Sequence, residues 1–80
     1  MSTITVFTKP SCVQCTYTKR KLDQMGISYD TIDVSLDEAA LEKVKNLGYL
    51  TAPVVLVSED GEDTQHWGGF QPDRLATLAA

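Results

Sequence analysis

The sequence predicts a single small α/β domain with the element order βαβαββα. Runs of β-branched and apolar residues alternate with segments of good helix formers, as expected when strands and helices follow one another. Glycine or proline stands near most of the expected boundaries. The 80 residues, 42% of them apolar and 22% charged, have the composition of a globular protein and suffice for one core. We therefore expect residues 1–80 to form one domain.

The first half of the chain predicts a strand, a helix and a second strand. Residues 3–8 are β-branched and alternate in polarity, and this strand ends before Pro10. Residues 13–25 favour a helix, and Gly26 stands where a left-handed C-cap is expected. Residues 27–34 contain the apolar positions of the second strand.

A second helix is predicted to follow a capping box. Ser35 would act as its N-cap, and Glu38 would bond back to the Ser35 amide. Ala40 and Val44 then recur on one helix face, and Gly48 is the expected stop.

The remaining residues predict two strands and a last helix. Residues 53–57 form a continuous apolar run, which is typical of a central strand covered on both faces. A polar turn over residues 58–63 leads to an antiparallel strand over residues 64–67. Pro72 suits the first turn of a helix that presents Leu75 to the core.

Charge and hydropathy limit the partners. The formal net charge of −4 argues against a nucleic acid, because a phosphate backbone binds clustered Lys and Arg that carboxylates do not dilute. We see neither a charged leader before an apolar segment nor an apolar run of about 18 residues, so we expect a soluble cytoplasmic monomer with no membrane partner. The basic run at residues 19–21 is either a solvated helix face or a docking patch for an acidic protein surface.

Cys12 and Cys15 are the only cysteines, and their spacing indicates a working dithiol. An α-helix places the Cα atoms of positions i and i+3 about 5 Å apart, inside the range of about 4.4 to 6.8 Å that a disulfide spans. Two cysteines without a leader also suggest a reducing compartment. A structural bridge across so short a loop would add little stability, and a zinc site would need about four ligands, so we expect no metal.

The two sulfur atoms are predicted to differ. Cys12 precedes the first helical turn, where free amides and the positive end of the helix dipole stabilise a thiolate. Cys15 starts a stripe that must face the sheet and that continues with Thr18, Leu22 and Met25. We expect the Cys12 thiolate to attack a substrate disulfide, and Cys15 then to release the reduced product and leave a Cys12–Cys15 disulfide.

These motifs resemble the NrdH-redoxins, small members of the glutaredoxin branch of the thioredoxin fold. The resemblance covers essentially the whole chain and rests on four segments: Cys12-Val13-Gln14-Cys15, Leu47-Gly48-Tyr49-Leu50, Ala52-Pro53-Val54-Val55 and the stretch from His66 to Arg74. It implies a thioredoxin fold with a four-stranded mixed sheet flanked by three helices. It also implies a cis peptide bond before Pro53, which would face the dithiol.

The resemblance further implies site residues and partners. Besides the catalytic Cys12 and Cys15, we assign substrate contacts to Lys9, Val13, Gln14, Thr51, Ala52, Pro53, Trp67, Gly68, Gly69 and Phe70. We expect Trp67 and Phe70 to be partly exposed near the dithiol. NrdH-redoxins reduce class Ib ribonucleotide reductase and take electrons from thioredoxin reductase. Because NADPH is used by that reductase, we expect no bound cofactor in this chain besides its own redox-active disulfide.

The tail of the chain departs from the family at two positions. The family motif reads Trp-Ser-Gly-Phe-Arg-Pro-Asp/Glu, whereas Gly68 replaces the serine and Gln71 replaces the arginine here. We therefore expect altered hydrogen bonds in the loop before the last helix.

Two alternative functions remain open. In a glutathione-dependent glutaredoxin, Lys9, Ala52 and the Gly68-Gly69 pair would bind the tripeptide, but Asp73 is the only carboxylate in the expected region. In an iron–sulfur scaffold, Cys12 of two chains and glutathione thiolates would hold a cluster. Such scaffolds usually carry a CGFS-like site, which differs from the sequence between the two cysteines.

Overall fold

The protein, described for residues 2–78 in a computed structural model, has the predicted order βαβαββα. Its strands are β1 (Ser2–Thr8), β2 (Asp30–Asp33), β3 (Val54–Glu59) and β4 (Glu62–Gly68). Its helices are α1 (Val13–Gln24), α2 (Glu38–Asn46) and α3 (Pro72–Ala76). The strands form one mixed sheet in the order β2-β1-β3-β4, with β1 and β2 parallel and the other neighbours antiparallel. The predicted fold class is confirmed.

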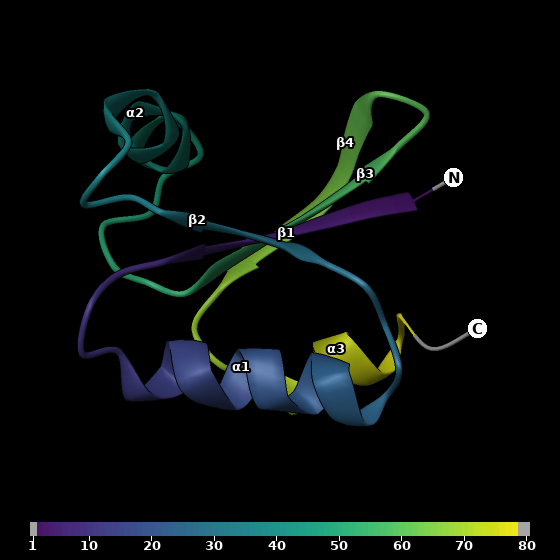
Figure 1. Cartoon of the computed structure of the whole chain (residues 1–80). Coiled ribbons are helices and arrows are strands. Elements are labelled where there is room, and N and C mark those ends of the chain that lie inside the picture. The colour runs from purple at the N-terminus through teal and green to yellow at the C-terminus, as the bar shows by residue number, and fades with distance from the viewer. Residues whose placement is uncertain (1, 79–80) are drawn as a thin grey trace.

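Helices cover both faces of the sheet, with α1 and α3 on one side and α2 on the other (Figure 1). Alternate residues of the central strands therefore enter two separate cores. The core on the α1 and α3 side contains Ile4, Val6, Leu22, Val55, Val57, Trp67 and Leu75. The core on the α2 side contains Phe7, Ala40, Val44, Val54 and Leu56. Strand β3 supplies both cores, which explains its continuous apolar run.

Trp67 belongs to the first core, so the expectation of partial exposure was wrong for this residue. Its side chain is only 2% exposed. It pairs with Val55 across β3 and β4, and this register turns both side chains toward α1 and α3. The guanidinium of Arg74 lies 4.7 Å from the centroid of the Trp67 ring, as in a cation–π contact. Two glycines follow Trp67, but the alternation of the strand decides the direction of its side chain.

The first two helices end at the predicted glycines. Gly26 and Gly48 have φ values of +69° and +98°, in the left-handed region where a side chain is disfavoured. In both cases the next amide donates back to a carbonyl of the last turn: Ile27 N to Leu22 O at 3.1 Å, and Tyr49 N to Val44 O at 3.0 Å. The Ile27 amide is used in this cap and lies outside β2, which begins at Asp30, where pairing with β1 starts, and not at the predicted residue 27.

The second helix has a different N-cap from the one predicted. The Asp37 carboxylate accepts a hydrogen bond from Ala40 N at 3.0 Å and is the N-cap of α2. Ser35 is occupied elsewhere, because its amide and its hydroxyl both donate to Asp33 Oδ1, at 2.8 and 2.6 Å. The predicted role of Ser35 was therefore wrong.

The hairpin between β3 and β4 is tighter than predicted. Strand pairing continues to Glu59 and Glu62, inside the segment predicted as a turn. Only Asp60 and Gly61 form the turn, with φ values of +52° and +85°. Positive φ at both positions is what a two-residue type I′ turn requires.

Two surface groups have shifted ionisation. The Ser58 hydroxyl and the Lys43 ammonium both donate to the Asp63 carboxylate, at 2.8 and 3.0 Å, and lower its pKa below the ordinary value of 3.8. Burial raises the pKa of Tyr29 above its ordinary value of 10.0, and the hydrogen bond from its hydroxyl to Asp23 at 2.9 Å adds to this shift.

Across residues 2–78, no helix has the length and apolar character that crossing a membrane demands.

Candidate active site

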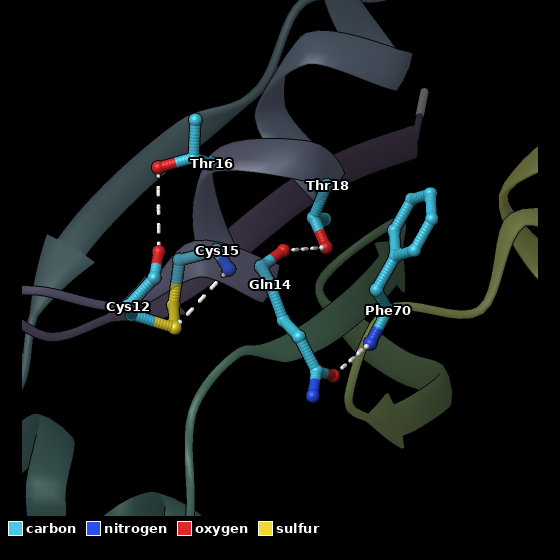
Figure 2. Close-up of a disulfide and its surroundings, with 6 residues drawn as sticks. All are labelled: Cys12, Gln14, Cys15, Thr16, Thr18 and Phe70. Carbon is cyan, nitrogen blue, oxygen red and sulfur yellow. Dashed lines mark hydrogen bonds between the residues drawn. A yellow bond between two sulfur atoms is a disulfide. The ribbon is translucent and has the colours of Figure 1, made fainter.

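Strand β1 leads directly to the dithiol at the start of α1. Between them, Ser11 takes a left-handed φ of +59°, which turns the chain toward Cys12. Cys12 is the N-cap of α1, and it forms a disulfide with Cys15 one turn later (Figure 2). The two Cα atoms lie 5.2 Å apart, close to the separation expected from helical geometry.

Cys15 is the enclosed sulfur of the pair. It is 1% exposed, and Thr18 and Leu22 continue its stripe with no exposed surface. Met25, the last member of the predicted stripe, is half-buried. The stripe therefore faces the sheet as predicted, most completely over its first three members.

Cys12 is the accessible sulfur. It is half-buried and lines an open hollow of the surface together with Lys9 and Lys19. The Cys15 amide donates to Cys12 Sγ at 3.1 Å, so the sulfur occupies the place of an N-cap acceptor. The chain has no acidic residue before Asp23. The free amides of the first helical turn and the two lysines of the hollow favour a thiolate at Cys12 once the disulfide is reduced.

Gln14, inside the dithiol motif, connects α1 to the loop before α3. Its side-chain Oε1 accepts a hydrogen bond from Phe70 N at 2.9 Å (Figure 2). Gly69 lies against the same oxygen, since a Cβ added to Gly69 would stand 3.3 Å from it. The Gly69 amide then donates to Pro53 O at 2.8 Å. Two hydrogen bonds therefore link the dithiol motif, the loop before α3 and the loop before β3.

The loop before β3 contains the implied cis peptide bond, between Ala52 and Pro53. Pro53 is buried, Ala52 is half-buried and Thr51 is exposed. Thr51, Ala52 and Lys9 line a mostly apolar cavity of about 160 Å³ on the α2 side of the sheet. Leu50 also lines it and is 91% exposed.

The loop before α3 keeps polar contacts at the departures from the family motif. Gln71 Nε2 donates to Gly68 O at 2.8 Å, so position 71 still supplies a hydrogen bond within the loop. At Gly68 an added Cβ would stand 3.0 Å from Cδ1 of Tyr49, so the Tyr49 ring occupies the space a side chain would need.

The structure gathers most of the predicted site residues and leaves one outside. Val13 is 62% exposed beside Cys12. Phe70 is half-buried, as expected, and its ring centroid lies 5.8 Å from that of Tyr17 on α1. Trp67 is separate from this surface, because its side chain points into the core.

Sequence reasoning missed one contact near the site. The Tyr49 hydroxyl lies 2.6 Å from His66 Nδ1, and the two rings meet edge to face with centroids 5.5 Å apart. The sequence predicts a helix that stops at Gly48, just before Tyr49, and a strand over residues 64–67 that includes His66, with nothing to join them. Strand alternation places His66 and Gly68 on one face, but no local pattern connects that face to Tyr49.

A dithiol that opens the helix after the first strand of such a mixed sheet defines a thiol–disulfide oxidoreductase with the thioredoxin fold. The glutaredoxin family model matches residues 4–62 of the chain. Two similar curated proteins each carry the description glutaredoxin-like protein NrdH. The one from Lactococcus lactis subsp. lactis is 34% identical, over 95% of this chain and 99% of its own length. The one from Salmonella typhimurium is 32% identical, over 94% of this chain and 86% of its own length. The chain therefore belongs to the glutaredoxin family, among its NrdH-type members.

Solved structures agree with this assignment. The NrdH-redoxin of Escherichia coli superposes with a TM-score of 0.85 at 34% identity, covering 96% of this chain and 95% of that one. Its structural study describes a thioredoxin-like activity profile for that glutaredoxin-like protein. The thioredoxin of Fasciola hepatica superposes with a TM-score of 0.80 over 98% of this chain and 77% of its own, but at 17% identity it supports the fold alone.

Proposed function

We propose that this protein is an electron carrier that reduces the disulfide of a class Ib ribonucleotide reductase and is recycled by thioredoxin reductase with NADPH. The observation that carries the proposal is the similarity, over almost the whole chain, to the E. coli protein described as having a thioredoxin-like activity profile. We place this activity in the reducing cytoplasm. The chain would bind no cofactor itself, because its own dithiol carries the two electrons.

The proposed reaction is a pair of thiol–disulfide exchanges. The Cys12 thiolate attacks one sulfur of the substrate disulfide, and the other substrate sulfur leaves as a thiolate that takes up a proton. Cys15 then loses its proton and attacks Cys12 Sγ. This step releases the second substrate thiol and leaves the Cys12–Cys15 disulfide, so the substrate gains two electrons and two protons. Thioredoxin reductase then reduces the Cys12–Cys15 disulfide by the reverse exchanges, which return two electrons and two protons to these sulfur atoms.

The remaining site residues are proposed to bind and orient the substrate. The Ala52 backbone would pair with an extended segment of the substrate beside Cys12, because Pro53 has no amide hydrogen and the preceding residue is left to supply the polar groups. Lys9, Val13 and Thr51 would contact the substrate from the exposed rim. Gln14, Gly68, Gly69 and Phe70 would contribute through the linked loop before α3.

Two cysteine variants test the roles of the sulfur atoms. We expect Cys12→Ser to abolish disulfide reduction, because the accessible nucleophile is lost. We expect Cys15→Ser to accumulate a covalent mixed disulfide with the target, because the second attack cannot occur. Intact-protein mass spectrometry after mixing with the target measures the adduct. Adduct formation by Cys12→Ser, and none by Cys15→Ser, would reverse the assignment.

A coupled assay tests the proposed reductant. The oxidised protein is mixed with NADPH and either thioredoxin reductase or glutathione with glutathione reductase, and NADPH consumption is followed at 340 nm. We expect fast turnover with thioredoxin reductase. Fast turnover only with the glutathione system would contradict the proposal and favour a glutathione-dependent glutaredoxin.

A further inference from the structure

The loop that carries Pro53 is anchored at two points. On the dithiol side, Pro53 O accepts the hydrogen bond from Gly69 N at 2.8 Å. At the other end the chain leaves α2 at Tyr49, whose amide completes the helix cap at 3.0 Å. Leu50 and Thr51 lie between these points and are exposed. Tyr49 is therefore the anchor on the far side of the loop.

The Tyr49 ring packs on the C-terminal end of β4, at Gly68. It is half-buried against the core on the α2 side. Two of its carbons, Cδ1 and Cε1, would lie 3.0 and 3.2 Å from a Cβ at Gly68, closer than ordinary van der Waals contact. A side chain at Gly68 would press on the ring, which would have to move by a few tenths of an ångström.

His66 holds the polar end of the same ring. Residues two apart on a strand point to the same face, so His66 lies beside the surface that Gly68 leaves open. The Tyr49 hydroxyl lies 2.6 Å from His66 Nδ1, within hydrogen-bond distance. The rings meet at 82°, an edge-to-face arrangement that aromatic pairs prefer. The loop is thus bound to β4 through one side chain with an apolar and a polar contact.

We propose that Tyr49 and His66 are positioning residues that fix the backbone of Ala52 for pairing with an extended protein substrate. They act through the loop and do not touch the sulfur atoms. Gly68 leaves the Tyr49 ring room to pack without displacement. The inference rests on the proposed exchange chemistry at Cys12 and is independent of which reductase and which natural target the protein uses.

The proposal predicts that substrates differ in their response. A peptide that pairs with the loop backbone requires the loop in place, whereas a small aromatic disulfide needs only access to Cys12. The test uses pre-reduced protein in single-turnover stopped flow, so no reductase enters the measurement. The two probes are a synthetic peptide with one internal disulfide and 5,5′-dithiobis(2-nitrobenzoic acid).

Three variants separate the ring from its hydrogen bond. We expect Tyr49→Phe and His66→Phe each to raise the half-saturating peptide concentration by about 2- to 10-fold, the range that corresponds to one net hydrogen bond. The limiting rate and the reaction with the small disulfide should stay unchanged. His66→Asn should restore most of the peptide response, because its side-chain oxygen can accept from Tyr49 at nearly the place of Nδ1. Gln65→Ala, the neighbouring exposed position of β4, is the control and should match the wild type.

Two outcomes would overturn the proposal. One is an unchanged peptide concentration dependence in both Phe variants, and the other is an equal loss with the peptide and the small disulfide, which would indicate general damage. Thermal melts check that each variant folds. If His66→Phe fails to fold, amide hydrogen exchange of Tyr49→Phe decides. We expect exchange of the Gly69 amide, which donates to Pro53 O at 2.8 Å, to quicken by about 2- to 10-fold while α1 stays unchanged, and unchanged exchange at Gly69 would refute the proposal.

Discussion

The hydrogen bond from Phe70 N to Gln14 Oε1 allows a quantitative test of how the dithiol motif holds the loop before α3. Gln14→Leu keeps a long helix-forming side chain but removes the acceptor, which lies 2.9 Å from the Phe70 amide. One such bond contributes about 0.5–1.5 kcal/mol net. In a domain of this size 1 kcal/mol corresponds to about 4–8 °C, so we expect Tm to fall by roughly 2–12 °C.

Calorimetry measures this change in Tm, and amide hydrogen exchange shows where it arises. We expect exchange at Phe70 to quicken by about 2- to 10-fold, because opening of the loop no longer breaks this bond. Gln24→Leu is the matched control, since it makes the same substitution at an exposed position near the end of the same helix. An unchanged Phe70 amide, or an equal fall in Tm for both variants, would refute the reasoning.

Three further predictions concern stability. Leu22→Ala should lower the free energy of unfolding by about 2–5 kcal/mol, because Leu22 is fully buried. Leu36 is 85% exposed, so Leu36→Ala should change this free energy by less than about 0.5 kcal/mol. Urea titration of both variants measures the difference. The lowered pKa of Asp63 stabilises the fold at pH above the unfolded pKa of 3.8, and this contribution disappears as pH falls through the folded pKa. Acidification should therefore destabilise the wild type more than Asp63→Asn. Parallel curves of stability against pH for the two proteins would contradict the shift. The raised pKa of Tyr29 stabilises the fold fully below the unfolded pKa of 10.0, and this stabilisation is lost as pH rises through the folded pKa. In urea titrations at alkaline pH, the wild type should therefore lose more stability than Tyr29→Phe.

The spacing of apolar residues and the positions of glycine and proline were enough to predict the elements that depend on local sequence. The glycines after α1 and α2, the apolar run of β3 and the Cys12–Cys15 spacing all act within one or two helical turns, so their consequences can be derived without tertiary information. The N-cap of α2 was predicted wrongly because both Ser35 and Asp37 are good caps, and Ser35 is taken up by its hydrogen bonds to Asp33.

The long-range contacts of the site could not be derived from spacing alone. The Gln14–Phe70 bond joins residues 56 positions apart, and the Tyr49–His66 bond joins the end of α2 to β4. Both depend on the sheet register, which also decides that Trp67 is buried while Gly68 faces the other core. Residue types at these positions indicated a possible role but not a partner.

The packing of Trp67 has a practical consequence for experiments on this protein. It is the chain's single tryptophan, and its ring lies between the core and the Arg74 guanidinium on α3. Fluorescence excited selectively from tryptophan therefore comes from one known place and needs no introduced label. A red shift in emission on adding denaturant would report entry of water at the junction of β4 and α3, next to the loop that binds Gln14.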